Sequence, residues 1–187
     1  MELRKLAAAA AAAAGFTLAA CGGGANDAAY GAPDEPGSTQ PPAEGPAVDP
    51  DERSLVVFAE DGPAADAARA AVESAELVAY EPGASVREEL VDAINAGPDA
   101  IVAVGPGAAA AVDSLSAEAL AQPFVVLGAQ LPEPTQNVTA VVWDGADERW
   151  DTAGDAEPDW SRLEEALGEG LAAAEDEERA GHVILLD

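Results

Sequence analysis

Side chains that could carry catalysis are few in this sequence. The chain has one cysteine, Cys21, and one histidine, His182, and none of its serines lies in a Gly-x-Ser-x-Gly elbow. Nucleophilic catalysis needs a nucleophile beside a base, and a metal site needs several clustered ligands. Because neither pattern is visible, we predict a protein that is not an enzyme and holds neither a metal nor a cofactor. We interpret His182 as a residue at a strand edge.

The surroundings of Cys21 indicate attachment of a lipid. Two basic residues at positions 4 and 5 precede an apolar segment and two small residues, an order typical of a secretory signal peptide over residues 1–20. The sequence Leu18-Ala19-Ala20-Cys21 resembles a bacterial lipobox. That resemblance implies cleavage before Cys21 and acyl chains, palmitate among them, that anchor the protein to the cell membrane on its extracytoplasmic side. The alternative is an ordinary secretory signal with a chance cysteine.

The charge of the chain excludes one class of partner. Eight Lys and Arg residues against 36 Asp and Glu residues give a net charge of -28 at neutral pH. Such an acidic surface repels nucleic acid and anionic lipid headgroups. We therefore expect no nucleic-acid partner, and we expect the hold on the membrane to come from the lipid on Cys21.

Composition divides the chain after the signal peptide into two parts. Residues 21–53 show no hydrophobic periodicity and are rich in Pro, Gly, Ala and acidic residues, which predicts a disordered tether behind the lipidated cysteine. Residues 54–187 alternate short apolar runs with helical patterns. We predict that this second part is a single α/β domain, long enough to bury a core.

The apolar runs define the expected strands of this domain. They cover residues 55–59, 76–80, 100–104, 124–128, 138–143 and 182–186. Helices are expected between them, one opened by a capping box at Ser85–Glu88 and a final one over 159–175. Several strands are apolar on both faces and alternate with helices, which predicts a three-layer αβα fold with a mostly parallel sheet of about five or six strands.

Candidate ligand-binding residues lie where these strands end, because open parallel sheets bind ligands beyond their carboxyl ends. The candidates are Glu60, Asp61, Gly105, Gly107, Gln130 and Asp144. The stretch Gly105-Pro106-Gly107 could form a phosphate loop, but the lysine and the third glycine of such loops are missing, which favours a tight strand-to-helix turn.

Two other groups of residues have alternative interpretations. Four aspartates at 61, 66, 144 and 147 could meet at a cation site, although their spacing is not that of a calcium loop. Three tryptophans at 143, 150 and 160 could stack on a ligand, but covering the edge of a small core is the favoured interpretation.

The segment from 76 to 145 resembles the basic membrane lipoprotein family. The resemblance rests on an Asp-led aliphatic strand ending in glycine at 99–105, a Phe-led strand at 124–127, the pair Asn137-Val138, and a strand entering an acidic turn at 141–144. Members of that family have a type I periplasmic-binding-protein fold, serve ABC importers and often bind purine nucleosides. The resemblance implies one lobe of such a receptor, a small-molecule solute such as a nucleoside, and an ABC permease or another envelope protein as partner.

The sequence departs from that family after the first expected strand and at the end of the fourth. Pro63-Ala64-Ala65 replaces an aromatic-Asn pair after the first strand, and Gly128-Ala129 replaces the acid that usually ends the fourth. The leading hypothesis is a membrane-anchored, solute-binding lipoprotein of an ABC importer, reduced to one lobe. The alternative is a non-catalytic interaction or sensor module that binds another envelope protein.

Overall fold

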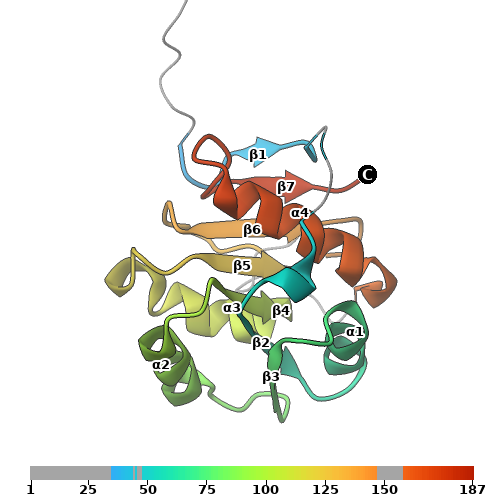
Figure 1. The fold of residues 1–187 in the computed structure, drawn as a ribbon, viewed down its shortest axis with the longest axis vertical. Helices are drawn as coiled ribbons and strands as arrows, with labels where there is room; N and C mark the ends of the chain where they lie inside the picture. Colours follow the sequence, from blue (N-terminus) through green and yellow to red (C-terminus); the bar gives the residue numbers. More distant parts are fainter. Residues whose placement is uncertain (1–34, 44, 46–47, 147–157) are drawn as a thin grey trace, which may run out of the picture. The chain divides into compact units, whose positions relative to one another are not determined.

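A computed structural model of the protein describes residues 35–43, 45, 48–146 and 158–187. In this part of the chain, seven parallel strands form one sheet (Figure 1). The strands are β1 (Thr39–Gln40), β2 (Leu55–Glu60), β3 (Glu76–Tyr80), β4 (Ala100–Val104), β5 (Phe124–Leu127), β6 (Val138–Val142) and β7 (Val183–Leu185). The helices are α1 (Pro63–Ala71), α2 (Arg87–Ala96), α3 (Gly105–Asp113) and α4 (Leu163–Glu175), with 3-10 helices η1 (Pro50–Glu52), η2 (Ser116–Glu118) and η3 (Trp160–Arg162).

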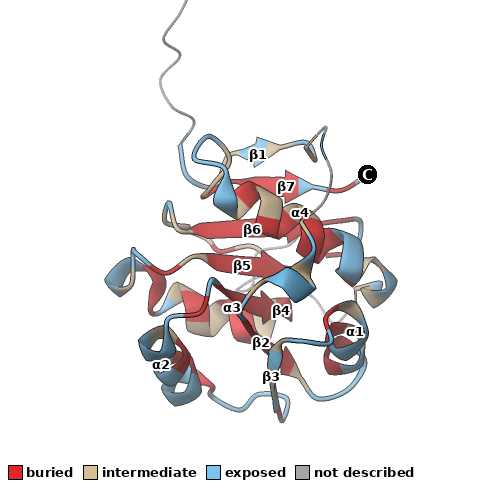
Figure 2. Ribbon diagram, viewed as in Figure 1, coloured by how far each residue is buried: buried red, intermediate tan, exposed pale blue. Residues whose placement is uncertain are grey.

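Helices cover both faces of the sheet, so the predicted three-layer α/β fold is confirmed. One core, which includes Val57 and Val102, lies between the sheet and helices α1 and α4. The other core includes Phe58 and Ile101 and lies under α2 and α3. Strands β4, β5 and β6 are buried along their whole length (Figure 2). Because both faces of these strands are covered, their apolar runs show no alternation.

The direction in which the chain adds strands reverses between β2 and β4. The sheet order is β1-β7-β6-β5-β4-β2-β3. The chain passes from β2 to the edge strand β3, returns across β2 to β4, and then adds β5, β6 and β7 on the far side. In open parallel sheets the loops at such a reversal are the ordinary place for a ligand.

Local sequence explains the start of α1 and the end of α2, but one predicted helix cap is wrong. Helix α1 begins at Pro63 behind Gly62, and α2 ends before Gly97, which adopts a left-handed φ of 67°. The predicted capping box at Ser85–Glu88 is wrong. The N-cap residue of α2 is Val86, and it makes no side-chain capping bond, so Ser85 lies one position too early to cap the helix.

The second half of the predicted tether differs from the prediction, because it packs on the domain. We call the described residues between 35 and 53 the strap. Its strand β1 extends the sheet beside β7, where the Gly37 amide donates to the Gly181 carbonyl at 2.7 Å and the Val183 amide donates to the Ser38 carbonyl at 2.9 Å. An open strand edge accepts any backbone, whatever its side chains, so the polar composition of the strap did not indicate this pairing.

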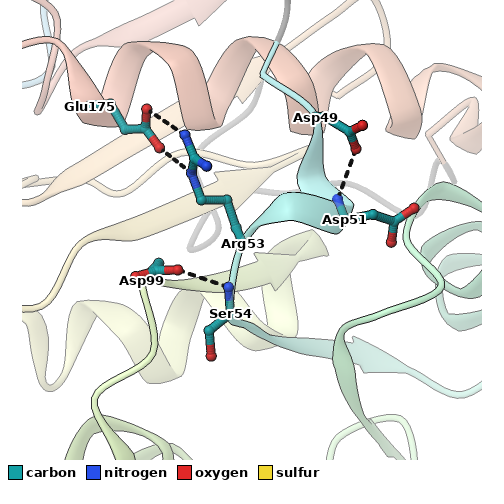
Figure 3. Close-up of polar contacts among 6 residues, drawn as sticks. All are labelled: Asp49, Asp51, Arg53, Ser54, Asp99 and Glu175. Atoms are coloured by element: carbon teal, nitrogen blue, oxygen red, sulfur yellow. Dashed lines mark hydrogen bonds and ion pairs between the residues drawn. The ribbon is translucent and has the colours of Figure 1, made fainter.

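The end of the strap is fastened by charged groups (Figure 3). Arg53 donates to both carboxylate oxygens of Glu175, at 2.7 and 3.2 Å, and Asp99 accepts from the Ser54 amide at 2.8 Å. Asp51 accepts from the amides of Ser74 and Glu73, and these bonds, Ser74's first, hold the pKa of Asp51 below its usual value. The strap is therefore tied to α4 and to the segment that follows α1.

The predicted signal peptide and Cys21 lie outside the described residues. Among the helices that are described, none has the length and apolarity that crossing a membrane requires.

Candidate ligand site at the carboxyl edge of the sheet

Three strands bring polar groups to one place beside the reversal point. Glu60 at the end of β2 pairs in register with Tyr80 at the end of β3. On the other side of β2, Ala59 pairs with Val104, so Gly105 follows at the level of Glu60. Alternation along β2 directs Glu60 to the same face as Phe58, under α2 and α3.

Gly107, in the first turn of α3, lies against both polar side chains. A Cβ atom added at Gly107 would lie 2.5 Å from Oε1 of Glu60 and 3.0 Å from the hydroxyl oxygen of Tyr80. The absence of a side chain at this position therefore leaves the room that the carboxylate and the phenol occupy. The sequence predicted Glu60, Gly105 and Gly107 as site residues, and the structure brings these three together.

Tyr80 is a site residue that the sequence analysis missed. Its side chain is 7 % exposed, and its buried hydroxyl has no hydrogen-bond partner within the described residues. Burial, and then the negative charge of Glu60, raise the pKa of Tyr80 above its ordinary value. The phenol therefore stays neutral and keeps a proton to donate. A tyrosine as the last residue of a strand, at the edge where ligands bind, is the signal that could have identified it.

Two tryptophans cover the ends of the neighbouring strands. The rings of Trp143 and Trp160 meet edge to face, with centroids 6.1 Å apart and planes at 78°. Trp143 is buried, and the half-buried Trp160 packs against the core between the sheet and helices α1 and α4. The favoured interpretation of these two tryptophans, as a cover on the core, is confirmed, while Trp150 lies outside the described residues.

The two tryptophan rings lie against two glycines that directly follow β4 and β5. Gly105 and Gly128 have φ angles of 81° and 73°, in the left-handed region that favours glycine. A Cβ added at Gly128 would lie 3.0 Å from Trp160 and 3.2 Å from Trp143, and one added at Gly105 would lie 3.4 Å from Trp160. A side chain at Gly128 would therefore crowd both rings, whereas one at Gly105 would reach only ordinary contact distance from Trp160.

The other predicted site residues lie elsewhere along the same edge. Asp61 is exposed in the turn after β2, and Asp144 is exposed in the turn after β6. Since β6 is the third strand from β2 at roughly 4.8 Å a strand, Asp144 is on the order of 14 Å from Glu60. Gln130, half-buried, follows β5. Asp144 therefore lies apart from the group formed by Glu60, Gly105 and Gly107.

The phosphate-loop alternative is also resolved. Residues Gly105 to Gly107 form the first turn of α3, which begins directly after β4. The carboxylate of Glu60 lies against this turn and would repel a phosphate. The favoured strand-to-helix turn is confirmed.

His182 and the aspartates form no metal site in the described part of the chain. His182 is 3 % exposed just before β7, and its Nδ1 lies 3.1 Å from the carbonyl oxygen of Arg179. No group of three or more potential metal ligands occurs among the described residues, and Asp147 lies outside them.

Two grooves lie at opposite edges of the sheet. One, of about 260 Å³, adjoins Trp160 at the carboxyl edge and lies between α1 and the start of α4. It is lined by Ala67, Ala70, Ala71, Trp160, Ser161, Leu163 and Glu164. The other, of about 280 Å³, is mainly apolar, and its lining includes Pro123, Asn137 and Ala180 at the amino ends of β5, β6 and β7.

Comparisons with known proteins give one partial similarity. No family model matches the chain, and no curated protein does. A crystal structure of ABC transporter system solute-binding proteins from Aeropyrum pernix K1 is similar to 48 % of this chain, with 25 % identity and a TM-score of 0.37. The chain covers 28 % of the length of that protein. The resemblance to the basic membrane lipoprotein family stays a prediction.

Proposed function

We propose that the protein is a lipid-anchored, extracytoplasmic binding lobe that takes up a small solute at the carboxyl edge of its sheet. In this proposal Cys21 holds it to the cell membrane, an ABC permease or another envelope protein is its partner, and it performs no catalysis. The observation that carries the proposal is the buried hydroxyl of Tyr80, which has no partner among the described residues. It lies beside Glu60 and Gly107, at the point where the strand order reverses.

An unpaired buried hydroxyl favours a bound partner. Leaving a buried donor unsatisfied costs roughly 1–3 kcal/mol, which a ligand or water that accepts from Tyr80 would recover. A solute group that accepts from the Tyr80 hydroxyl and donates to the Glu60 carboxylate satisfies both side chains together. A hydroxyl group has that combination, as found in nucleosides and sugars.

Charge narrows the class of solute further. Glu60 lies at this edge with the exposed Asp61 next to it, and the whole chain carries a charge of -28. An anionic solute would meet repulsion there. We therefore expect a neutral or positively charged solute.

The alternative function is an interaction module, and a specific observation favours it. The half-buried Trp160 ring lies against Gly105 and Gly128 at the ends of β4 and β5, so this part of the edge presents aromatic surface. Aromatic residues at a surface are typical of protein interfaces.

A thermal-unfolding screen tests the two functions. Intrinsic tryptophan fluorescence of the full-length chain would be followed with nucleosides, sugars and amino acids at millimolar concentration. Binding to the folded state alone raises stability by mass action, by about 2.7 kcal/mol at a hundred times Kd. We expect a rise in Tm with a hydroxyl-bearing solute, lost in Tyr80→Phe and kept in Tyr30→Phe, the same change outside the described residues. If no solute raises Tm, the receptor function is wrong.

Anchoring has a separate test. Cys21→Ala removes the sulfur that would carry the lipid, so we expect the variant to leave the membrane fraction. Continued retention in membranes would contradict lipidation at this residue.

A further inference from the structure

Trp160 lies at the carboxyl edge, next to the two glycines that follow β4 and β5. The glycines present no side chain to its indole, and Trp143 meets the ring edge to face. We call the space that the Trp160 indole fills beside these glycines the slot.

The occupied state leaves an indole donor without a partner. Nε1 of Trp160 is buried and has no hydrogen bond to any described residue. Such a donor costs roughly 1–3 kcal/mol when buried, a penalty that disappears if the ring finds an acceptor. The packed position of Trp160 is thus favoured by ring contacts and opposed by its polar atom.

A second position for the ring lies next to the first. The groove of about 260 Å³ adjoins Trp160, and its wall on α1 is made of the small residues Ala67, Ala70 and Ala71. Ser161 and Glu164 line the same groove and carry oxygen atoms that can accept a hydrogen bond from an indole. A ring that moved into the groove would keep apolar contact and gain a partner for Nε1.

We propose that Trp160 is a gate for this edge. In the closed state its indole fills the slot over Gly105 and Gly128. In the open state the indole lies in the alanine-lined groove, and the slot receives a planar aromatic ring of the solute. This inference rests on the proposed function for the presence of a solute, and it adds that the solute carries such a ring.

The slot is tested by emptying it. In full-length Trp160→Ala we expect a lower Tm and a rise of several degrees on adding millimolar indole. The rise should be smaller in the unmodified chain, because there the Trp160 ring competes for the slot. Trp160→Phe, which keeps a ring in place, is the matched control and should also show the smaller rise. A Trp160→Ala variant that shows no indole response would overturn the slot.

The gate is tested without any solute or destabilising change. With 5-fluorotryptophan incorporated, fluorine NMR of the full-length chain should show two environments in exchange for the signal that Trp160→Phe removes. Ala70→Phe fills the groove, and it should leave Tm unchanged while collapsing that signal to one environment. A single environment in the unmodified chain would overturn the gate even if the slot binds indole. A failed solute screen with two environments would instead reject the proposed function alone.

Discussion

The amino edge of the sheet is closed by directional polar contacts, whereas the carboxyl edge is closed by aromatic rings lying on glycines. At the amino edge, the strap is tied by Asp51 and by the pair of Arg53 with Glu175. At the carboxyl edge, Tyr80, Trp143 and Trp160 each leave a buried polar atom without a partner among the described residues.

The difference agrees with the proposal that a ligand binds at the carboxyl edge and not at the amino edge. Donors and acceptors that are already paired gain no hydrogen bond from a ligand. An unpaired buried donor gains one, and this recovers the free energy that its burial costs. The amino edge has exceptions in Ser38 and His182, whose Oγ and Nε2 are also unpaired. Those two residues directly precede β1 and β7, at the amino ends of these strands, whereas parallel sheets bind ligands beyond the carboxyl ends.

The largest expected loss of stability comes from a substitution that disrupts the packing of Trp143 and Trp160. In Gly128→Val, left-handed strain of about 1–3 kcal/mol adds to crowding against both indole rings, which costs about 1–3 kcal/mol more. Gly83→Val is the control, because Gly83 has a similar φ of 77° with no atom within 4 Å of an added Cβ. Urea unfolding should show the greater loss for Gly128→Val, and equal losses would mean that the rings do not press on this glycine.

A smaller difference in stability is expected between two variants that each remove a buried hydroxyl, one at each edge of the sheet. Thr139, near the amino edge, accepts from the Gly181 amide at 3.2 Å, so Thr139→Val should lose about 1–3 kcal/mol of unfolding free energy. Tyr80→Phe removes a hydroxyl that has no partner in the described part of the chain, so the stability of this variant should stay the same or rise. A loss in Tyr80→Phe as large as that in Thr139→Val would show that Tyr80 is paired after all.

The smallest effect is the pH response of the strap. The folded-state pKa of Asp51 lies below its unfolded value, so its contribution to stability is present above about pH 4 and is lost as pH falls through the folded pKa. Asp51→Asn should therefore lose less stability than the unmodified chain on acidification below pH 4. Asp92→Asn, on an exposed position of α2, is the control and should follow the unmodified chain.

The fold was largely predictable because its signals are local. Strands β3 and β4 match the expected segments 76–80 and 100–104 residue for residue. Strand β4 is a continuous apolar run, and β3 is a run of apolar and aromatic residues that follows Glu76. The strap was not predictable from composition, because its contacts are made by backbone atoms and by charges far apart in sequence.

The site was predictable only in part. Glu60, Gly105 and Gly107 follow from the rule that carboxyl ends of parallel strands meet at one edge. The distance of Asp144 from them was not predictable, because sequence order does not give the order of strands in the sheet. The packing of Trp160 over Gly105 and Gly128 joins residues up to 55 positions apart (160 minus 105), which no local pattern encodes.

The central claim is that the solute binds at the carboxyl edge, and backbone amide NMR tests it most directly. The solute that raises Tm most would be titrated into the labelled full-length chain. We predict that the shifts concentrate at Glu60, Tyr80, Gly105 and Gly107. Shifts concentrated instead around the amino-edge groove, at Asn137 and Ala180, would contradict the account.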